Sequence, residues 1–192
     1  AVFDLYFRKM PFNSGYAVFN GLKRVVNFIE NFGFTNEDIT YLKSIGYEED
    51  FLNYLKDLKF TGNIKSMQEG EICFGNEPLL RVEAPLIQAQ LIETILLNII
   101  NFQTLIATKA SRIRQIATHD SLMEFGTRRA QEIDAALWGA RAAFIGGFDS
   151  TSNVRAGKLF NIPVSGTHAH ALVQTYGDER SEEHTSELQS PR

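Results

Sequence analysis

The sequence is poor in cysteine and has no excess of positive charge. Cys73 is the single cysteine among 192 residues, which excludes an internal disulfide and fits a reducing compartment. Lysine and arginine number 19 against 23 for aspartate and glutamate, so the net charge is −4. This balance gives no support for binding to nucleic acid or to a membrane surface. We therefore expect a cytoplasmic protein with neither kind of partner.

An uninterrupted apolar run long enough to cross a membrane is also missing. The longest apolar stretch, at 85–110, is broken every few positions by Gln, Asn or Glu. A spanning helix needs about 20 predominantly apolar residues, so we interpret this stretch as one long helix buried on most sides. Pro85 suits its first turn, and Lys109, Arg112 and Arg114 suit its negative end.

The sequence does have the composition of a folded protein, with 44% hydrophobic and 22% charged residues. Residues 1–84 predict a mixed α/β portion. In chain order, the pattern predicts a strand at 2–7, helices at 17–32, from 35 and around 51–58, and strands at 64–68, 70–74 and 79–82. The first helix is expected to close at Gly33, and residues 35–38 match a capping box.

Beyond the long helix, strand and helix patterns alternate. They predict a strand at 122–125, a helix at 129–143, a strand at 144–148, a helix at 153–160, an extended piece at 161–165 and a helix at 166–173. This alternation is typical of parallel βα units in a barrel or an open sheet. Reacting groups gather at the carboxyl ends of such strands, which here precede 125–129, 147–152 and 165–170.

Two histidines, His168 and His170, follow the last predicted strand beside Gly166 and Thr167. A His-x-His pair can ligate a metal, as in barrel metallohydrolases, although those place the pair after their first strand. A single imidazole could instead act as a nucleophile or accept a phosphate, because its charge is easily tuned near neutral pH. The residues alone leave both interpretations open.

The segment 125–129 combines an aromatic ring, Phe125, with the guanidinium groups of Arg128 and Arg129. This set suits a flat anionic ligand, because the ring can stack and an arginine can grip a carboxylate or phosphate. The alternative is a core phenylalanine beside solvated arginines. For so short a string, that alternative is the commoner one.

Asp149 follows the strand predicted at 144–148. Its carboxylate could hydrogen-bond a ligand, help to hold Mg²⁺, or cap the helix predicted at 153–160. Capping is the commoner role of an aspartate at such a place.

The arrangement of these strings is more specific than any one of them. Residues 124–131, 146–154 and 166–171 follow one another in this order at close spacing. Together with 7–12 and 15–22, they resemble the nicotinate phosphoribosyltransferase family. The resemblance covers nearly all of residues 1–179.

The resemblance implies both a reaction and a fold. The family joins nicotinate to the ribose of phosphoribosyl pyrophosphate, giving nicotinate mononucleotide and pyrophosphate in NAD biosynthesis. ATP is a co-substrate whose hydrolysis is coupled through a phosphorylated histidine, so the enzyme is classed as a ligase, and Mg²⁺ is the expected metal. The implied fold class is α/β, an irregular barrel of the type II phosphoribosyltransferases beside a mixed N-terminal domain, assembled as a homodimer.

By motif, the resemblance implies that His170 is the phosphate-accepting residue and that Phe125 stacks on the pyridine ring. Further substrate contacts are implied for Arg128, Thr167, Asp149 and, across the dimer, Arg8.

We expect three parts: a mixed α/β portion at 1–84, the long helix with the first βα units at 85–179, and a disordered tail at 180–192. The tail resembles a translated sequencing adapter and is expected to be non-native. We expect the chain to be a fragment of an incomplete barrel, inactive alone. The alternatives are a metal-dependent barrel hydrolase using His168 and His170, and an inert interaction module without catalysis.

Overall fold

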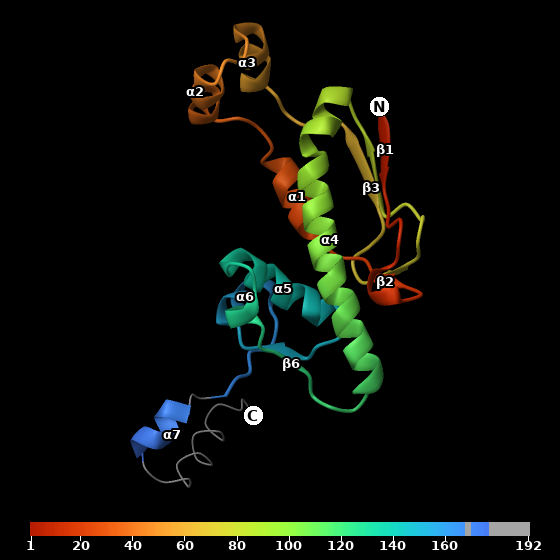
Figure 1. The fold of residues 1–192 in the computed structure, drawn as a ribbon, viewed down its shortest axis with the longest axis vertical. Helices are drawn as coiled ribbons and strands as arrows, with labels where there is room; N and C mark the ends of the chain where they lie inside the picture. Colours follow the sequence, from red (N-terminus) through yellow and green to blue (C-terminus); the bar gives the residue numbers. More distant parts are fainter. Residues whose placement is uncertain (168–169, 177–192) are drawn as a thin grey trace. The chain divides into compact units, whose positions relative to one another are not determined.

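The computed structural model describes residues 1–167 and 170–176, so the tail predicted at 180–192 lies outside the described residues. The chain forms two units, Ala1–Phe102 (unit 1) and Gln103–Arg192 (unit 2). The division falls inside the long helix α4 (Leu86–Ile116), which contributes its first half to unit 1 and its second half to unit 2 (Figure 1). The predicted boundary between residues 84 and 85 stays a prediction.

Unit 1 is built on a three-stranded antiparallel sheet in the order β1 (Val2–Leu5), β5 (Leu80–Glu83) and β3 (Asn63–Ser66). A second antiparallel pair joins β2 (Ala17–Val18) to β4 (Ile72–Cys73). The period of two along β5 buries Leu80 and Val82, whereas Arg81 faces outward and grips Asp4 with two hydrogen bonds of 2.7 and 2.8 Å. The strands predicted around residues 2, 64, 72 and 80 are therefore confirmed.

Three short helices, α1 (Leu22–Glu30), α2 (Asn36–Ser44) and α3 (Glu49–Lys56), follow one another in unit 1, and a 3-10 turn, η1 (Pro11–Asn13), precedes them. The prediction that α1 begins at residue 17 is wrong, because 17 and 18 pair in β2 and Gly21 has a positive φ of 111°. A side chain at Gly21 would press on Ile99 and Ile100 of α4. The helix also ends at Glu30, before the predicted stop at Gly33.

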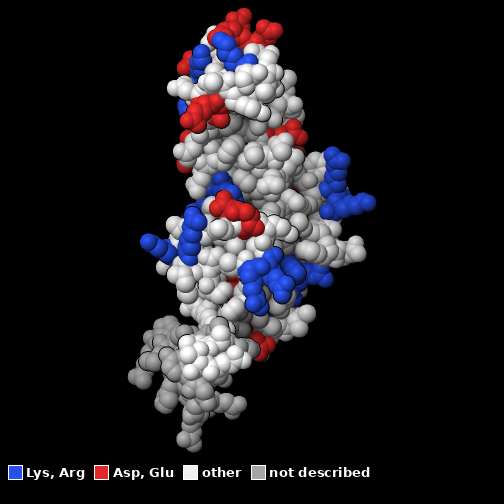
Figure 2. Space-filling view, turned by 60° about the vertical axis from the view of Figure 1, so that its left-hand side comes forward, with Lys and Arg blue, Asp and Glu red and all other residues white. Residues whose placement is uncertain are grey.

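Acidic and basic side chains are interspersed over α2 and α3, as the face drawn in Figure 2 shows. The capping box predicted for α2 is confirmed. The Asp38 carboxylate accepts hydrogen bonds from the backbone N–H and the hydroxyl of Thr35, both at 2.7 Å, and the Thr35 hydroxyl accepts one from the Asp38 N–H at 3.2 Å. Four polar groups at this helix start are thereby satisfied locally.

The first half of α4 supplies one side of the unit 1 core. Its buried apolar residues there are Ala89, Ile92, Leu96, Ile99 and Ile100. By length and composition α4 could cross a membrane, since the mean hydropathy of an 18-residue window reaches 1.5. We assign it to the core because these side chains pack on the sheet and the short helices. The prediction of burial on most sides was too strong, since Leu97 is 46% exposed.

Unit 2 contains a small parallel sheet. β6 (Met123–Glu124) pairs with β7 (Ser150–Thr151), and Thr151 also bridges to Val164 in parallel. The connections are the 3-10 turn η2 (Thr127–Arg129) with α5 (Ile133–Ile145), and α6 (Val154–Phe160); α7 (His170–Tyr176) follows. Leu137, Ala140 and Ala156 form the core between α5 and α6. The predicted parallel βα order is confirmed.

Three boundaries in unit 2 differ from prediction. The strand expected at 144–148 is wrong, because α5 continues to Ile145 and Gly146 lies so close to Ala107 and Ala110 of α4 that a side chain would not fit. Gly147 then reverses the chain with a φ of 106°, and the strand comes later as β7. Helix α5 starts at 133 instead of 129, and α7 at 170 instead of 166.

Replacing Thr35 by alanine removes the hydroxyl of the capping box. We expect the free energy of unfolding to fall by about 1 kcal/mol, because an N–H at the start of α2 loses its acceptor. Urea denaturation of this chain measures the change. Thr35→Ser keeps the hydroxyl and is the matched control; equal stability of the two variants would contradict the capping role.

Candidate functional site

The parallel sheet of unit 2 has two ends with different chemistry. Leu122 and Asp149 precede β6 and β7 at the amino ends of the strands, where the Asp149 N–H donates to the Leu122 carbonyl at 2.8 Å. Phe125 and Ser152 follow the same strands at the carboxyl ends. The candidate site is at the carboxyl ends, the edge at which parallel α/β folds bind their ligands.

Phe125 leads into η2 at this carboxyl edge. Its side chain is 43% exposed, whereas a core phenylalanine would be buried. The turn is closed by a hydrogen bond from the Arg129 N–H to the Gly126 carbonyl at 2.8 Å, and Arg128 is exposed within it. An exposed ring and an exposed guanidinium thus lie three residues apart on one turn, as the interpretation as a ligand site requires.

A polar network that the sequence did not single out joins this turn to β7. Glu124 accepts a hydrogen bond from the Thr151 hydroxyl at 2.7 Å, and its carbonyl accepts one from the Ser152 N–H at 2.9 Å. Asn153 caps α6 by accepting from the Ala156 N–H at 3.0 Å. The signal available in the sequence was an acidic residue next to the last position of the strand predicted at 122–125.

The third strand end brings residues 165–167 towards the same edge. The Ser165 N–H donates to the Thr151 carbonyl at 3.1 Å, and Thr167 is exposed two residues later. His170 is the first residue of α7, but the position of its imidazole and the whole of His168 lie outside the described part of the chain. The convergence of His170 with Phe125 and Arg128 therefore stays a prediction.

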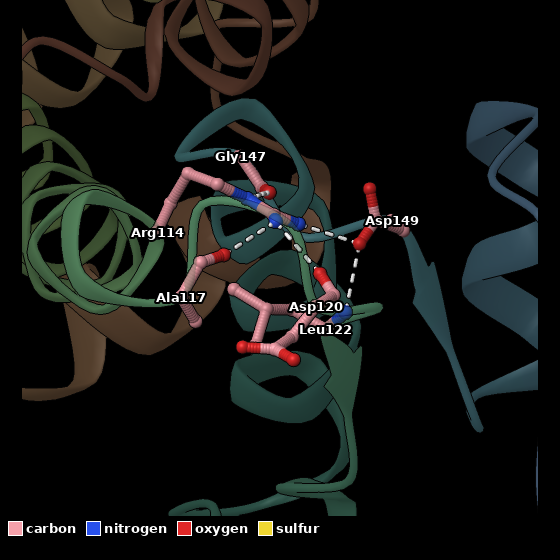
Figure 3. A network of polar contacts seen from close by, with 6 residues as sticks. All are labelled: Arg114, Ala117, Asp120, Leu122, Gly147 and Asp149. Atoms are coloured by element: carbon pink, nitrogen blue, oxygen red, sulfur yellow. Dashed lines mark hydrogen bonds and ion pairs between the residues drawn. The ribbon is translucent and has the colours of Figure 1, made fainter.

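Asp149 is tied to Arg114 at the opposite, amino-terminal edge of the sheet (Figure 3). Its Oδ2 atom accepts hydrogen bonds from Arg114 Nη2 at 2.5 Å and from the Leu122 N–H at 2.7 Å. The interpretation of Asp149 as the helix cap is wrong, since Asn153 caps α6. Its role as a substrate contact stays a prediction.

The Arg114 guanidinium holds three loop carbonyls besides this carboxylate. It donates to the carbonyls of Gly147 at 2.7 Å, Ala117 at 2.9 Å and Asp120 at 2.8 Å (Figure 3). Sequence reasoning placed Arg114 at the helix end for its charge alone, whereas the structure makes it the clamp between α4 and the start of β7. The pKa of the Asp149 carboxyl is lowered most by the hydrogen bond from the Leu122 N–H and next by the hydrogen bond from the Arg114 guanidinium.

Arg8 belongs to unit 1 and is exposed there. It borders an open hollow of about 350 Å³, which Tyr6, Asn98 and Asn101 also line. A phosphate contact across a dimer stays a prediction for this residue.

The described residues contain no group of three His, Cys, Asp or Glu side chains that could hold a metal ion. The two carboxylates nearest the sheet are already engaged, Glu124 by Thr151 and Asp149 by Arg114. Within the described ranges, a metal cage built by protein side chains therefore does not fit.

Comparison with known proteins gives consistent results for both units. The family model of the nicotinate phosphoribosyltransferase (NAPRTase) N-terminal domain matches residues 1–101, and that of the NAPRTase family matches residues 121–190. The nicotinate phosphoribosyltransferase of Bacillus subtilis is 64% identical over 180 residues, which are 93% of this chain and 37% of the relative. Nicotinate phosphoribosyltransferase 2 of Arabidopsis thaliana is 47% identical, over 92% of this chain and 32% of the relative.

Solved structures agree. The human nicotinic acid phosphoribosyltransferase matches with a TM-score of 0.85 and 38% identity, over 91% of this chain and 36% of that one. The nicotinate-nucleotide pyrophosphorylase of Pyrococcus furiosus matches with a TM-score of 0.73 and 27% identity, over 94% of this chain and 39% of that one. The chain spans about a third of the length of the curated relatives it matches. These neighbours confirm the predicted fold class, that of the type II phosphoribosyltransferases.

Replacing Arg114 by alanine removes the donor of three carbonyls and the counter-charge of Asp149. We expect the free energy of unfolding to fall by about 1.5–3 kcal/mol, the range for hydrogen bonds that involve a charged group. Urea denaturation of this chain measures it. Lys109→Ala removes an exposed cation from the same helix and is the control; an equal, small effect of both substitutions would contradict the clamp.

The acid limb of stability should also depend on Asp149. The pKa of the Asp149 carboxyl is lowered in the folded protein. The ionised carboxylate therefore stabilises the fold at pH values above its ordinary pKa of 3.8. That contribution is lost as the pH falls through the lowered value. Asp149→Asn should therefore flatten the fall of the unfolding midpoint below about pH 4, recorded by thermal melts from neutral pH downward. An unchanged acid limb would contradict the assignment.

Proposed function

This chain belongs to the nicotinate phosphoribosyltransferase family, and from this membership we propose that it is part of an enzyme that transfers the phosphoribosyl group of phosphoribosyl pyrophosphate to nicotinate. The products are nicotinate mononucleotide and pyrophosphate. The observation that supports the proposal in the structure is the exposed Phe125 and Arg128 on one turn at the carboxyl ends of parallel strands.

The reaction has demands that these residues can meet. The lone pair of the pyridine nitrogen attacks the anomeric carbon of the sugar, and the bond to pyrophosphate breaks, its electron pair leaving with the pyrophosphate. The attacking ring must be held close to a cation-like carbon. Phe125 can stack on that ring, Arg128 can pair with its carboxylate and Thr167 can hydrogen-bond it, which orients the nitrogen.

His170 is proposed to accept a phosphoryl group from ATP. An imidazole nitrogen attacks the γ-phosphorus and ADP leaves, so the histidine gains about −1.5 to −2 charges by analogy with phosphorylated hydroxyls. Placement of this residue at the start of α7, after the third strand end, supports the proposal. The added charge would change the affinity of nearby loops for the anionic substrates.

Mg²⁺ is proposed to enter with the substrate. Phosphate oxygens are ligands that Mg²⁺ prefers, and the engaged carboxylates of Glu124 and Asp149 lead us to assign it no ligand among the described side chains. Bound to the phosphate oxygens of the substrate, Mg²⁺ would neutralise charge on the departing pyrophosphate.

The assembly is proposed to be a homodimer in which Arg8 reaches a substrate phosphate. A cytoplasmic location is proposed because Cys73 is a free, buried thiol.

Substitution of Phe125 and Arg128 tests the acceptor site in a protein of full family length that carries this sequence. Phe125→Ala should raise the KM for nicotinate about tenfold, and Arg128→Ala tenfold to a hundredfold, because stacking and a charge-assisted pair are lost. Steady-state formation of nicotinate mononucleotide measures both. Arg155→Ala, an exposed arginine on α6, should leave the KM unchanged. Normal KM values in Phe125→Ala and Arg128→Ala would refute the assignment. This chain alone, without the rest of the family's length, is expected to form no product.

Labelling with γ-labelled ATP tests His170 in the same protein. The unsubstituted enzyme should carry an acid-labile phosphate and lose it, together with ATP-coupled turnover, on His170→Ala. His119→Ala removes an exposed histidine beyond α4 and is the control. Normal coupling in His170→Ala would refute the role. Stoichiometric zinc that is lost on changing His168 or His170 would favour the metal-dependent hydrolase instead.

A further inference from the structure

Glu124 ends β6 with its carboxylate held between two strand ends. One oxygen, Oε1, accepts a hydrogen bond from the Gly126 backbone N–H, and the other, Oε2, accepts one from the Thr151 hydroxyl at 2.7 Å. The Glu124 side chain is half-buried and Thr151 is fully buried. Each oxygen of the Glu124 carboxylate thus has its own partner: one binds the backbone two residues later, and the other binds a side chain of β7.

These bonds are part of a closed circuit. The Thr151 hydroxyl oxygen also accepts from the Asn153 N–H at 3.0 Å, and the Asn153 side-chain amide donates to the Thr127 hydroxyl at 3.4 Å. Thr127 is next to Gly126, so the circuit returns to the turn that Glu124 holds. Segment 125–128, which carries the exposed ring and guanidinium, is therefore linked to β7 through Glu124 and to Asn153, two residues beyond β7, through Thr127.

The residue types on the turn fit this role of Glu124. A Cβ atom at position 126 would come within 2.6 Å of Glu124 Oε1, so a side chain there would crowd the carboxylate that binds the N–H. An alanine at 124 could accept neither bond, and a glutamine would offer one oxygen where two are used. The glycine at 126 thus suits an acid at 124.

We propose that Glu124 is a positioning residue for the transfer reaction: its carboxylate holds segment 125–128 in the single shape in which Phe125 and Arg128 can receive nicotinate. The inference rests on the proposed function of this turn. Without the carboxylate, the segment occupies other shapes for most of the time. If about one tenth of the molecules keep the competent shape, the apparent dissociation constant rises about tenfold while the bound state still reacts.

The kinetic test uses a protein of full family length that carries this sequence. Glu124→Ala and Thr151→Val should each raise the KM for nicotinate about tenfold, with little change in kcat and in the KM for phosphoribosyl pyrophosphate. Thr151→Ser keeps the hydroxyl and should restore a normal KM. Ile162→Val, in the buried part of unit 2, lowers stability without touching the circuit and should leave the KM unchanged.

Hydrogen exchange supplies a readout that does not depend on turnover. The Gly126 amide should exchange faster in Glu124→Ala, whereas the Gly146 amide at the end of α5 should not change. Normal KM values in Glu124→Ala and Thr151→Val, or unchanged exchange at Gly126, would overturn the inference. A KM that rises equally in Ile162→Val would also overturn it. Failure of the unsubstituted protein to make nicotinate mononucleotide refutes the proposed function instead, before any variant is compared.

Discussion

The parallel pairing of β6 with β7 is the constraint on which unit 2 depends. Each strand has only two residues, so the backbone ladder supplies few hydrogen bonds. Side chains add to the pairing at both ends: at the amino ends the Asp149 carboxylate accepts from the Leu122 N–H and from Arg114 of α4, and at the carboxyl ends Glu124 accepts from Thr151. Hydrogen bonds that involve a charged group are stronger than neutral ones, so these carboxylates add to the backbone bonds that join the ends of a very short sheet.

The carboxylates of Asp149 and Glu124 have different partners and lie at opposite ends of the parallel sheet, so only Glu124 is close to the candidate site. The charge of Asp149 is balanced by an arginine, on the side of the sheet away from the turn at 125–128. Glu124 is held by an N–H and a hydroxyl at the edge where the exposed Phe125 and Arg128 lie. An anionic acceptor that arrives at this edge would meet a guanidinium, while the nearby carboxylate is already hydrogen-bonded.

Close backbone approaches explain where local reasoning failed. The periodicity of 17–32 was helical, yet Gly21 packs on α4 with a positive φ, so α1 could begin only after it. The apolar string at 144–148 was strand-like, yet Gly146 packs against α4 and ends a helix there. In both places a contact distant in sequence decided the backbone conformation, which propensity alone does not contain.

The sequence by itself determined the alternating order of strands and helices in unit 2, the long helix, the capping box at Thr35 and the family, because periodicity, short-range hydrogen bonds and motif order are written in neighbouring residues. It also marked the segment at 125–129 as a candidate site. Only the tertiary structure decided that Arg114 clamps Asp149 and that Glu124 meets Thr151. The paired residues lie 35 and 27 positions apart along the chain, so their bonds exist only once α4 and the two strands have come together.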